Sequence, residues 1–394
     1  MTQPHWTLLA TVFAAQAIGV GVTFGAFTVF VDPIVNEFDS SRGVVSAGIG
    51  LMALMIGVMG PVWGPWIDAG AFRRMMVGGA ATLSASLLAA SFAPSLPALA
   101  FLCALAGTVA PLIGPLIGSS LIGKVFVEAR GRSLGIASMG PPAGTFLFAI
   151  LGGEWIVEFG WRTALRGFGV VAGLLVPVLF FVIPKQVSRL VPASQQVRWT
   201  RSRLLRARSF LTGAVAMGIA AGLSLGWGSQ VVPFVSDLGH GFEASAFVAA
   251  VGGGTGIVGT LLFGFLADRW SARWLFLTVI VVQAGSFCVY LSAPAYPVLL
   301  AAAALSGICG GSFATLYAML LTERFGAAEL GQTLGLTNVF VLPFASLSPV
   351  FAGTLRDSSG SYGLPLVVLA GGMLVAACAL LVPSPRAVSP AAEE

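Results

Sequence analysis

Charged residues are scarce in this sequence. Only 9% of its 394 residues are Asp, Glu, Lys or Arg, whereas a soluble domain averages about 25%. Hydrophobic residues make up 57% of the chain, and the mean hydropathy is +0.94. So little polar surface excludes a soluble enzyme, a disordered chain and a nucleic-acid-binding protein. The composition is that of a protein that crosses a membrane many times.

Histidine and cysteine are also rare. His5 and His240 are the only histidines, and both fall outside the apolar segments, so we expect no metal site, no cofactor and no enzyme activity. Free cysteine in an apolar segment behaves as a small hydrophobic residue, so no disulfide framework is expected. The cysteines, all within apolar segments, are Cys103, Cys288, Cys309 and Cys378.

Twelve apolar segments approach the length of about 20 residues that a membrane-spanning helix needs. Helices are expected because backbone amides must be satisfied within the segment once water is absent. The sequence therefore predicts an all-α membrane protein. The spans are Thr7–Ile34, Val44–Trp66, Met75–Phe92, Leu96–Gly123, Ser133–Gly153, Thr163–Ile183, Phe210–Val235, Ser245–Leu266, Trp274–Leu291, Val298–Leu321, Thr333–Leu355 and Leu364–Val382.

The basic residues predict the orientation. With the N-terminus inside, only Arg42, Arg162, Arg166 and Arg356 of the 20 Lys and Arg residues fall in outer loops. The others face the cytoplasm, as the positive-inside rule requires for an even number of spans. We therefore expect an integral protein of the bacterial inner membrane with both termini cytoplasmic.

The chain divides into two halves in which the same residues recur at equivalent positions. We expect a six-helix half at 1–184, a basic cytoplasmic linker at 185–209 and a second six-helix half at 210–394. The linker carries seven basic residues and no acid; it anchors topology, and binding of anionic lipid headgroups is an open alternative. Gly64, Asp68, Arg73, Gly131, Gly135 and Gly160 recur 200 positions later as Gly264, Asp268, Arg273, Gly331, Gly335 and Gly360. Repeats at one offset indicate a duplication, an architecture typical of transporters.

The loop between the second and third spans carries a specific resemblance. It reads G-P-W-I-D-A-G-A-F-R-R over Gly64–Arg74, and Gly264–Arg273 is its copy. This loop resembles the signature loop of the major facilitator superfamily. Two positions depart from the family's loop. The Gly three residues after the Asp is Ala71 here, and the Arg directly after the Asp is Ala69, whereas the second copy has Arg269 at the latter place. The resemblance implies twelve helices in two halves.

A narrower resemblance is to the monocarboxylate-transporter-like branch. It depends on the exit of the first span, Gly25–Gly43, and on Gly131–Gly135 and Gly160–Arg162. This resemblance implies a monocarboxylate-like acid as cargo. The basic residue that such transporters carry in span 8 is missing, because its approximate place holds Thr260.

The resemblance also implies a cytoplasmic gate at the two signature loops. A carboxylate there can face the positive end of a neighbouring helix and pair with nearby Arg, and such modest interactions suit reversible closure. The simpler alternative is that these charges only set topology. The gate residues are Asp68, Arg73, Arg74, Asp268, Arg269 and Arg273.

Polar and aromatic residues inside the spans are the candidates for substrate binding. A polar side chain in a membrane helix usually faces the protein interior or a wet cavity, and hydrogen bonding between helices is an equally good explanation for each. By resemblance, spans 1, 4, 7 and 10 line the central path. The candidates are Gln16, Thr23, Phe24, Trp227, Gln230, Tyr317 and Asn338.

No charged residue lies near the middle of any predicted span. A proton relay through buried side chains is therefore not expected, whereas protonation of the substrate, substrate exchange, or coupling at Asp32 or Glu154 stays open. A carboxylate would have to be held by neutral donors such as Gln16, or by the N-terminus of a broken helix.

The sequence thus predicts a monomeric secondary active or facilitative transporter that moves a small organic solute by alternating access. A monocarboxylate-like acid is the first choice of cargo. An exporter of a neutral or amphipathic compound on the same fold is the alternative. A membrane enzyme or receptor would need a cluster of His, Asp or Glu at one membrane face, or a sizeable soluble domain, and neither is evident in the sequence.

Overall fold

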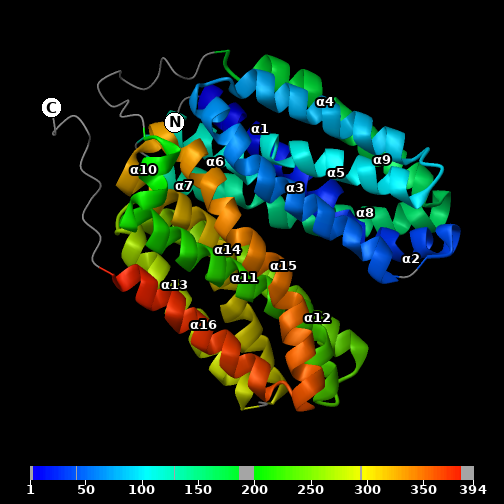
Figure 1. The fold of residues 1–394 in the computed structure, drawn as a ribbon, viewed down its shortest axis with the longest axis vertical. Coiled ribbons are helices and arrows are strands. Elements are labelled where there is room, and N and C mark those ends of the chain that lie inside the picture. The colour runs from blue at the N-terminus through cyan, green and yellow to red at the C-terminus, as the bar shows by residue number, and fades with distance from the viewer. Residues whose placement is uncertain (1–2, 41, 128, 186–198, 293–294, 383–394) are drawn as a thin grey trace. The chain divides into compact units, whose positions relative to one another are not determined.

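The computed structural model describes residues 3–40, 42–127, 129–185, 199–292 and 295–382 (Figure 1). Every regular element in these residues is helical. Residues 186–198, which form much of the predicted linker, lie outside the described residues. The described end of that linker contains the short helix α10, Arg201–Arg206.

The chain forms two compact units that do not follow the sequence order completely. The first unit takes its described residues from 1–128, 136–196 and 328–336. The second takes its described residues from 129–135, 197–327 and 337–394. Each unit therefore contains a short segment from the other half of the sequence.

In the first unit, helix α4 packs along α9 and helix α1 along α8 (Figure 1). Three predicted spans are interrupted, and one of them is the fifth, which is divided at Met139 between α7 and α8. The first contains a π-helical segment, η1, between α1 and α2, and the fourth breaks into α5, the short 3-10 turn η2, and α6. The elements are α1 Gln3–Val20, η1 Gly21–Gly25, α2 Ala26–Phe38, α3 Arg42–Asp68, α4 Phe72–Ala90, α5 Leu96–Val109, η2 Ala110–Leu112, α6 Pro115–Val125, α7 Arg130–Ser138, α8 Gly140–Phe159 and α9 Trp161–Val182.

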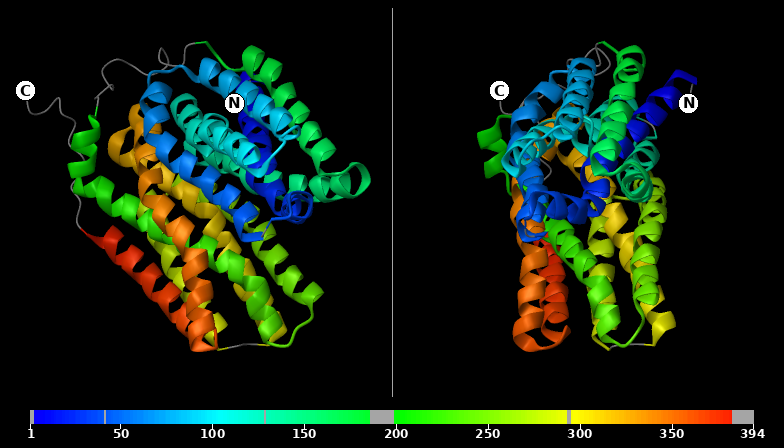
Figure 2. Two further views of the ribbon diagram at one scale, coloured as in Figure 1. Left: turned by 45° about the vertical axis from the view of Figure 1, so that its right-hand side comes forward. Right: turned by 90° about the vertical axis from the view of Figure 1, so that its right-hand side faces the viewer.

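The second unit has longer, uninterrupted helices, and α16 runs alongside α11 (Figure 2). Its tenth predicted span is a single 30-residue helix, α14, where the fourth span of the first unit is broken. The elements are α11 Arg208–Asp237, α12 Phe242–Ala267, α13 Ala272–Leu291, α14 Tyr296–Phe325, η5 Ala327–Glu329, α15 Leu330–Ser359 and α16 Gly363–Leu381.

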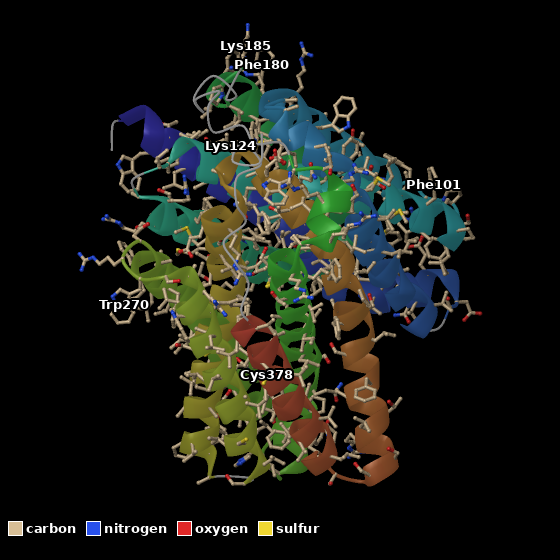
Figure 3. All side chains as sticks on the ribbon, turned by 60° about the vertical axis from the view of Figure 1, so that its left-hand side comes forward. Phe101, Lys124, Phe180, Lys185, Trp270 and Cys378 are labelled. Carbon is tan, nitrogen blue, oxygen red and sulfur yellow. The ribbon has the colours of Figure 1, made fainter. Side chains whose placement is uncertain are left out.

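The helices have the length and surface of membrane spans. Eleven segments in the described residues are long and apolar enough to cross a bilayer. The remaining predicted span is α4, whose 19 residues begin with Phe72 and two Arg and are rich in Gly, Ala and Ser. Large apolar side chains such as Phe101, 69% exposed, project outward (Figure 3), which is costly in water and favourable in lipid. The predicted all-α membrane fold is confirmed, and the helices fit twelve spans.

Glycines let α12 and α14 approach very closely. A Cβ at Gly307 would lie 2.0 Å from the Gly252 carbonyl oxygen, and one at Gly311 would lie 2.1 Å from that of Gly256. Thr260 also joins the two helices, because its hydroxyl donates to the Gly311 carbonyl oxygen at 2.8 Å. Close backbone packing of this kind replaces the hydrophobic effect, which does not drive helices together in lipid.

We expect Gly307→Ala to destabilise the protein, because its methyl group has no room beside α12. Overpacking of a tight interface typically costs about 1–3 kcal/mol. Gly310→Ala on the same helix is the matched control, since no atom lies within 4 Å of its Cβ position. Thermal unfolding of the purified protein in detergent would test this prediction, and equal melting temperatures for the two variants would contradict it.

Candidate functional site

The first candidate feature is a carboxylate at the start of α15. Asp68 ends α3, and Gly70 makes the following turn with φ +86°. One oxygen of Asp68 accepts the backbone N–H of Gly331 at 2.9 Å, and the other accepts that of Gln332 at 2.6 Å. The side chain thereby caps a helix N-terminus, where a negative charge is favoured. We call Asp68, Gly331, Gln332 and Lys124 the first carboxylate cap.

The second unit repeats this arrangement 200 positions later. Asp268 accepts the backbone N–H of Gly131 at 2.6 Å and that of Arg132 at 3.1 Å, at the start of α7. We call Asp268, Gly131 and Arg132 the second carboxylate cap. In both caps the aspartate comes from one half of the sequence and the capped helix begins in the other half.

The two caps differ in the cation that accompanies the aspartate. Lys124 Nζ lies 3.2 Å from Asp68 Oδ1, with side-chain exposures of 3% and 11%. Arg132 Nε lies 3.0 Å from Asp268 Oδ2, but the Arg132 side chain is 52% exposed. Because screening by water weakens exposed pairs and burial makes an unpaired charge costly, the first cap contains much the stronger electrostatic constraint.

Glycines make the close approach to each carboxylate possible. A Cβ at Gly131 would lie 2.7 Å from Asp268 Oδ1, and one at Gly331 would lie 2.9 Å from Asp68 Oδ1. Gly64 and Gly264 face these same helix starts, where a Cβ would lie 2.8 Å from the Gly331 carbonyl oxygen and 2.7 Å from that of Gly131, respectively. Four of the repeated glycines, Gly64, Gly131, Gly264 and Gly331, are thus explained by the packing of the caps.

The predicted gate arginines have a different role from the aspartates. Arg73 Nε donates to the Ile183 carbonyl oxygen at 2.6 Å, just after α9. Arg273 donates to the Leu380 carbonyl oxygen through Nε at 3.0 Å and through Nη2 at 2.6 Å, at the end of α16. Both therefore satisfy carbonyls at a helix C-terminus, where a positive charge is favoured. The remaining predicted gate residues, Arg74 and Arg269, are exposed.

Three predicted substrate residues lie in the first unit. Gln16 is fully buried on α1, and neither its amide nitrogen nor its amide oxygen has a hydrogen-bond partner. Thr23 is buried in η1, and its hydroxyl donates to the Gly19 carbonyl oxygen at 2.7 Å. Phe24 is half-buried in the same π-helical segment, a type of irregularity often found at functional sites.

The other four lie in the second unit, but not at one place. Trp227 is buried among aromatic rings, with Tyr290 at 4.8 Å between centroids. Gln230 accepts a hydrogen bond from the Tyr362 hydroxyl. Tyr317 instead packs near Gly213. Gly213 and Trp227 both lie on α11, where the 14 positions between them span about 21 Å.

Tyr317 is also hydrogen-bonded within the unit, because its hydroxyl lies 2.9 Å from that of Thr337. Asn338, the next residue along α15, is half-buried. The predicted residues of the second unit therefore form two groups, one around Trp227 and one around Tyr317. Each predicted substrate contact stays a prediction.

Each unit contains a pocket. The pocket of the first unit has a volume of about 240 Å³, and its mostly apolar wall includes Thr23, Ser86 and Cys103. The Thr23 hydroxyl donates to a carbonyl of α1, and the Ser86 hydroxyl donates to a carbonyl of its own helix, α4. The pocket of the second unit has a volume of about 450 Å³ and is lined by residues such as Tyr290 and Tyr362.

The described residues contain no group of three His, Cys, Asp or Glu side chains placed to hold a metal ion. Thr260, at the place of the family's basic residue, is 1% exposed and donates to the Gly256 and Gly311 carbonyl oxygens. Glu154 is exposed on α8, and the side chain of Asp32 lies outside the described residues.

A cluster that we call the Arg162 clasp joins the end of α2 and the start of α9 to the segment after α4. Arg162 donates through Nη2 to Glu37 Oε1 at 2.6 Å, through Nη1 to the Ser91 carbonyl oxygen at 2.8 Å and through Nη2 to the Ala93 carbonyl oxygen at 2.9 Å. The Trp161 indole N–H donates to the other oxygen of Glu37. These hydrogen bonds to Arg162 and Trp161, together with the Arg162 charge, hold the pKa of Glu37 below its usual value, against the opposing effect of burial.

Comparisons with known proteins decide the family. A family model described as the Major Facilitator Superfamily matches residues 7–266 and 231–394. The chain belongs to the major facilitator superfamily. The predicted resemblance to this superfamily is therefore confirmed.

Curated relatives within the superfamily support the narrower branch. Monocarboxylate transporter 12 of Rattus norvegicus is 27% identical over 62% of this chain, which spans 57% of that protein's length. Monocarboxylate transporter 11 of Mus musculus is 28% identical over 94% of this chain and 85% of its own length. The human organic anion transporter MFSD10 has a similar fold, with a TM-score of 0.75 at 12% identity, over 96% of this chain and all of that chain.

Sequence reasoning missed several partners in this superfamily member. The sequence showed Lys124 only as a charge at the end of a span. The roles of Arg132, Gln332 and the Arg162 clasp were not predicted. One signal was available: Lys124 and Glu37 recur as Arg324 and Asp237 at the same 200-residue offset as the other repeats.

We expect Glu37→Gln to lower the melting temperature at neutral pH but not at low pH, because it removes the negative charge of the Arg162 clasp. A carboxyl group with a lowered folded pKa stabilises the fold above its unfolded pKa, about 4.3, and loses this contribution as the pH falls through the folded value. The effect should stay below about 1 kcal/mol, because the pair is partly exposed. Melting temperatures from pH 3 to 7 should therefore converge between wild type and Glu37→Gln at low pH.

Glu158→Gln, an exposed position on α8, is the control for the loss of one negative charge. If the gap between wild type and Glu37→Gln stayed constant over the pH range, the clasp would not act through the Glu37 charge.

Proposed function

We propose that this protein is a secondary active or facilitative transporter that moves a monocarboxylate-like organic acid by alternating access. The choice of cargo is supported by the similarity of the chain to monocarboxylate transporters 12 and 11. The mechanism is supported by one structural observation, the pair of carboxylate caps.

The caps are suited to a reversible gate. Helix α15 begins in the first unit and continues into the second, and Asp68 contacts its first turn. Opening this cap releases the start of α15 from α3 without breaking a helix. Hydrogen bonds to a charged acceptor contribute about 1.5–3 kcal/mol each, which is strong enough to hold a closed state and weak enough to exchange. We propose the same role for Asp268 at α7, with Arg73 and Arg273 anchoring helix ends beside the gate.

The predicted location and surroundings are part of this proposal. The distribution of basic residues supports the bacterial inner membrane with both termini cytoplasmic. We further propose a monomer with halves at 1–184 and 210–394, joined by the basic segment 185–209, which can also hold anionic lipids. Nucleic acid is not expected as a partner.

A second candidate is export of a neutral or amphipathic compound. The apolar pocket of about 240 Å³ in the first unit favours it, because such walls bind apolar rather than ionic groups. Gln16, Thr23 and Phe24 are the proposed substrate contacts of this unit in either case, and Trp227, Gln230, Tyr317 and Asn338 those of the other.

Uptake into proteoliposomes separates the two functions. We expect saturable uptake of at least one labelled short acid from a panel of acetate, lactate, pyruvate and benzoate, measured with and without a pH gradient. Protein-free liposomes are the control for diffusion of the acid through lipid. If no acid is taken up or competes while lipophilic compounds are moved, the exporter replaces the acid transporter.

For the gate, we expect Asp68→Asn to reduce the transport rate far more than substrate affinity. The substitution leaves Lys124 buried without its counter-charge, which typically costs about 3–5 kcal/mol in the closed state. Asp268→Asn is the matched comparison, and it should have a milder effect because Arg132 is half-exposed and its pair is worth about 0–1 kcal/mol.

The double variant Asp68→Asn with Lys124→Met should recover part of the melting temperature, because it removes the unpaired charge. Transport rate and substrate affinity, measured on the same preparations, test the assignment. Equal losses of rate and affinity in Asp68→Asn would argue against a gate.

A further inference from the structure

The break in the fourth span leaves a helix N-terminus inside the first unit. Helix α6 begins at Pro115, and its N-cap residue, Gly114, has no side chain to cap it. Pro115 has no N–H, and the first N–H groups of a helix have no carbonyl partner within it. The Gly118 N–H is the first in this helix to bond back, to the Gly114 carbonyl oxygen at 3.1 Å. The N–H groups of the buried residues Leu116 and Ile117 lie in this first turn, where α6 itself offers them no carbonyl partner.

The unpartnered amide of Gln16 lies at this same helix start. A Cβ built on Gly118 would lie 2.6 Å from Gln16 Nε2 and 2.9 Å from Gln16 Cδ, and a helical Cβ tilts toward the N-terminus of its helix. Gly19, one turn further along α1, packs against Ile113 in the break itself. Burying an amide without hydrogen-bond partners costs about 1–3 kcal/mol of stability. A ligand that hydrogen-bonds to Gln16 would remove this cost.

Tight packing holds Gln16 in this position. A Cβ at Gly140 on α8 would lie 2.6 Å from the Phe13 carbonyl oxygen and 3.0 Å from Gln16 Cβ. At Gly144, one turn later, a Cβ would lie 1.9 Å from the Ala17 carbonyl oxygen. Helix α1 is therefore fixed against α8 on one side, while Gln16 presents its amide to α6.

The duplicated half serves as an internal comparison. The positions equivalent to Gln16, Pro115 and Gly118 are Ala216, Thr315 and Ala318, and α14 continues through that region without a break. The polar side chain and the broken helix thus occur together in one half only. A feature required merely for packing two similar halves would not need this pairing.

We propose that Gln16 and the N-terminus of α6 bind the head group of the transported acid in its uncharged, protonated form. A primary amide offers one donor and one acceptor side by side, and so does a carboxylic acid. Gln16 Nε2 donates to the acid's carbonyl oxygen, the acid's O–H donates to Gln16 Oε1, and the first-turn N–H groups of α6 donate to the same carbonyl. Both unpartnered atoms of Gln16 are then satisfied.

Binding of the neutral acid also fits the charges around the site. Lys124 is the charge on α6, six positions and about 9 Å beyond Gly118, and it is paired with Asp68. On α8, Glu154 lies 14 positions, about 21 Å, beyond Gly140, and Glu158 lies further still. Arg162 and Arg166 of α9 donate hydrogen bonds to Ser91, beyond the end of α4. An ionised carboxylate would be buried there without a cation, which costs several kcal/mol, whereas a neutral acid carries its own proton across.

This inference rests on the proposed transport of an acid, and its test uses three probes that share one carbon skeleton. The probes are lactic acid, lactamide and methyl lactate, bound to the purified full-length protein and measured by calorimetry. The amide has the donor and acceptor that Gln16 requires, so we expect it to bind independently of pH. We expect the ester, which has no donor on its carboxyl group, to bind at least roughly tenfold more weakly.

The dissociation constant for lactic acid, expressed as total acid, should rise about tenfold per pH unit between pH 5 and 8, because only the protonated fraction binds. A constant value over this range, together with no binding of lactamide, would overturn the proposal in favour of an ionised carboxylate bound by other residues.

Two variants locate the site. Gln16→Met removes the amide at similar volume, and Gly118→Ala places a methyl group where the amide lies; each should weaken binding of acid and amide at least roughly tenfold. Gly78→Ala on α4 is the matched control, since its Cβ would meet no atom within 4 Å. If Gly118→Ala does not fold, Gln16→Met alone decides.

The outcomes separate this site from the wider proposal. If wild-type protein neither binds nor transports any acid of the panel, the proposed function is wrong. If it transports acids while Gln16→Met and Gly118→Ala bind them as wild type does, the site assigned to Gln16 is wrong and the transport function stands.

Discussion

Two aspartates that cap helices from the opposite half of the sequence are the interaction on which this molecule depends. Asp68 and Asp268 each receive two backbone N–H groups of a helix start. A helix N-terminus buried among apolar side chains would otherwise leave those groups without water or partner. The caps therefore satisfy the backbone and join segments from the two halves of the sequence.

The duplication supplies the scaffold, and departures from it supply the specialisation. The first cap has the buried Lys124 as its cation, whereas the second has the half-exposed Arg132. The fourth span breaks at Pro115, whereas its counterpart α14 is continuous. Both differences place the more constrained polar groups in the first unit.

Uncharged polar groups make many of the contacts between helices in a chain that is only 9% charged. Helices in lipid are packed through small residues such as Gly307 and Gly311 rather than by release of water. The buried hydroxyls of Thr23 and Thr260 donate to carbonyls of their own or adjacent helices. An amide such as Gln16, which is fully buried and has no partner, stands out against that background because nothing in the packing accounts for it.

The sequence by itself determined the helical membrane fold, the spans and the duplication. The length of apolar runs and the recurrence of residues at a fixed offset can be read directly from the chain. It also placed Asp68 and Asp268 at helix ends. Only the tertiary structure decided that the aspartates cap helices of the other half, that Arg73 and Arg273 bind helix C-termini instead, and that Lys124 is the buried counter-charge. These pairings join residues 56 to 264 positions apart, and hydropathy contains no information about which helix ends meet.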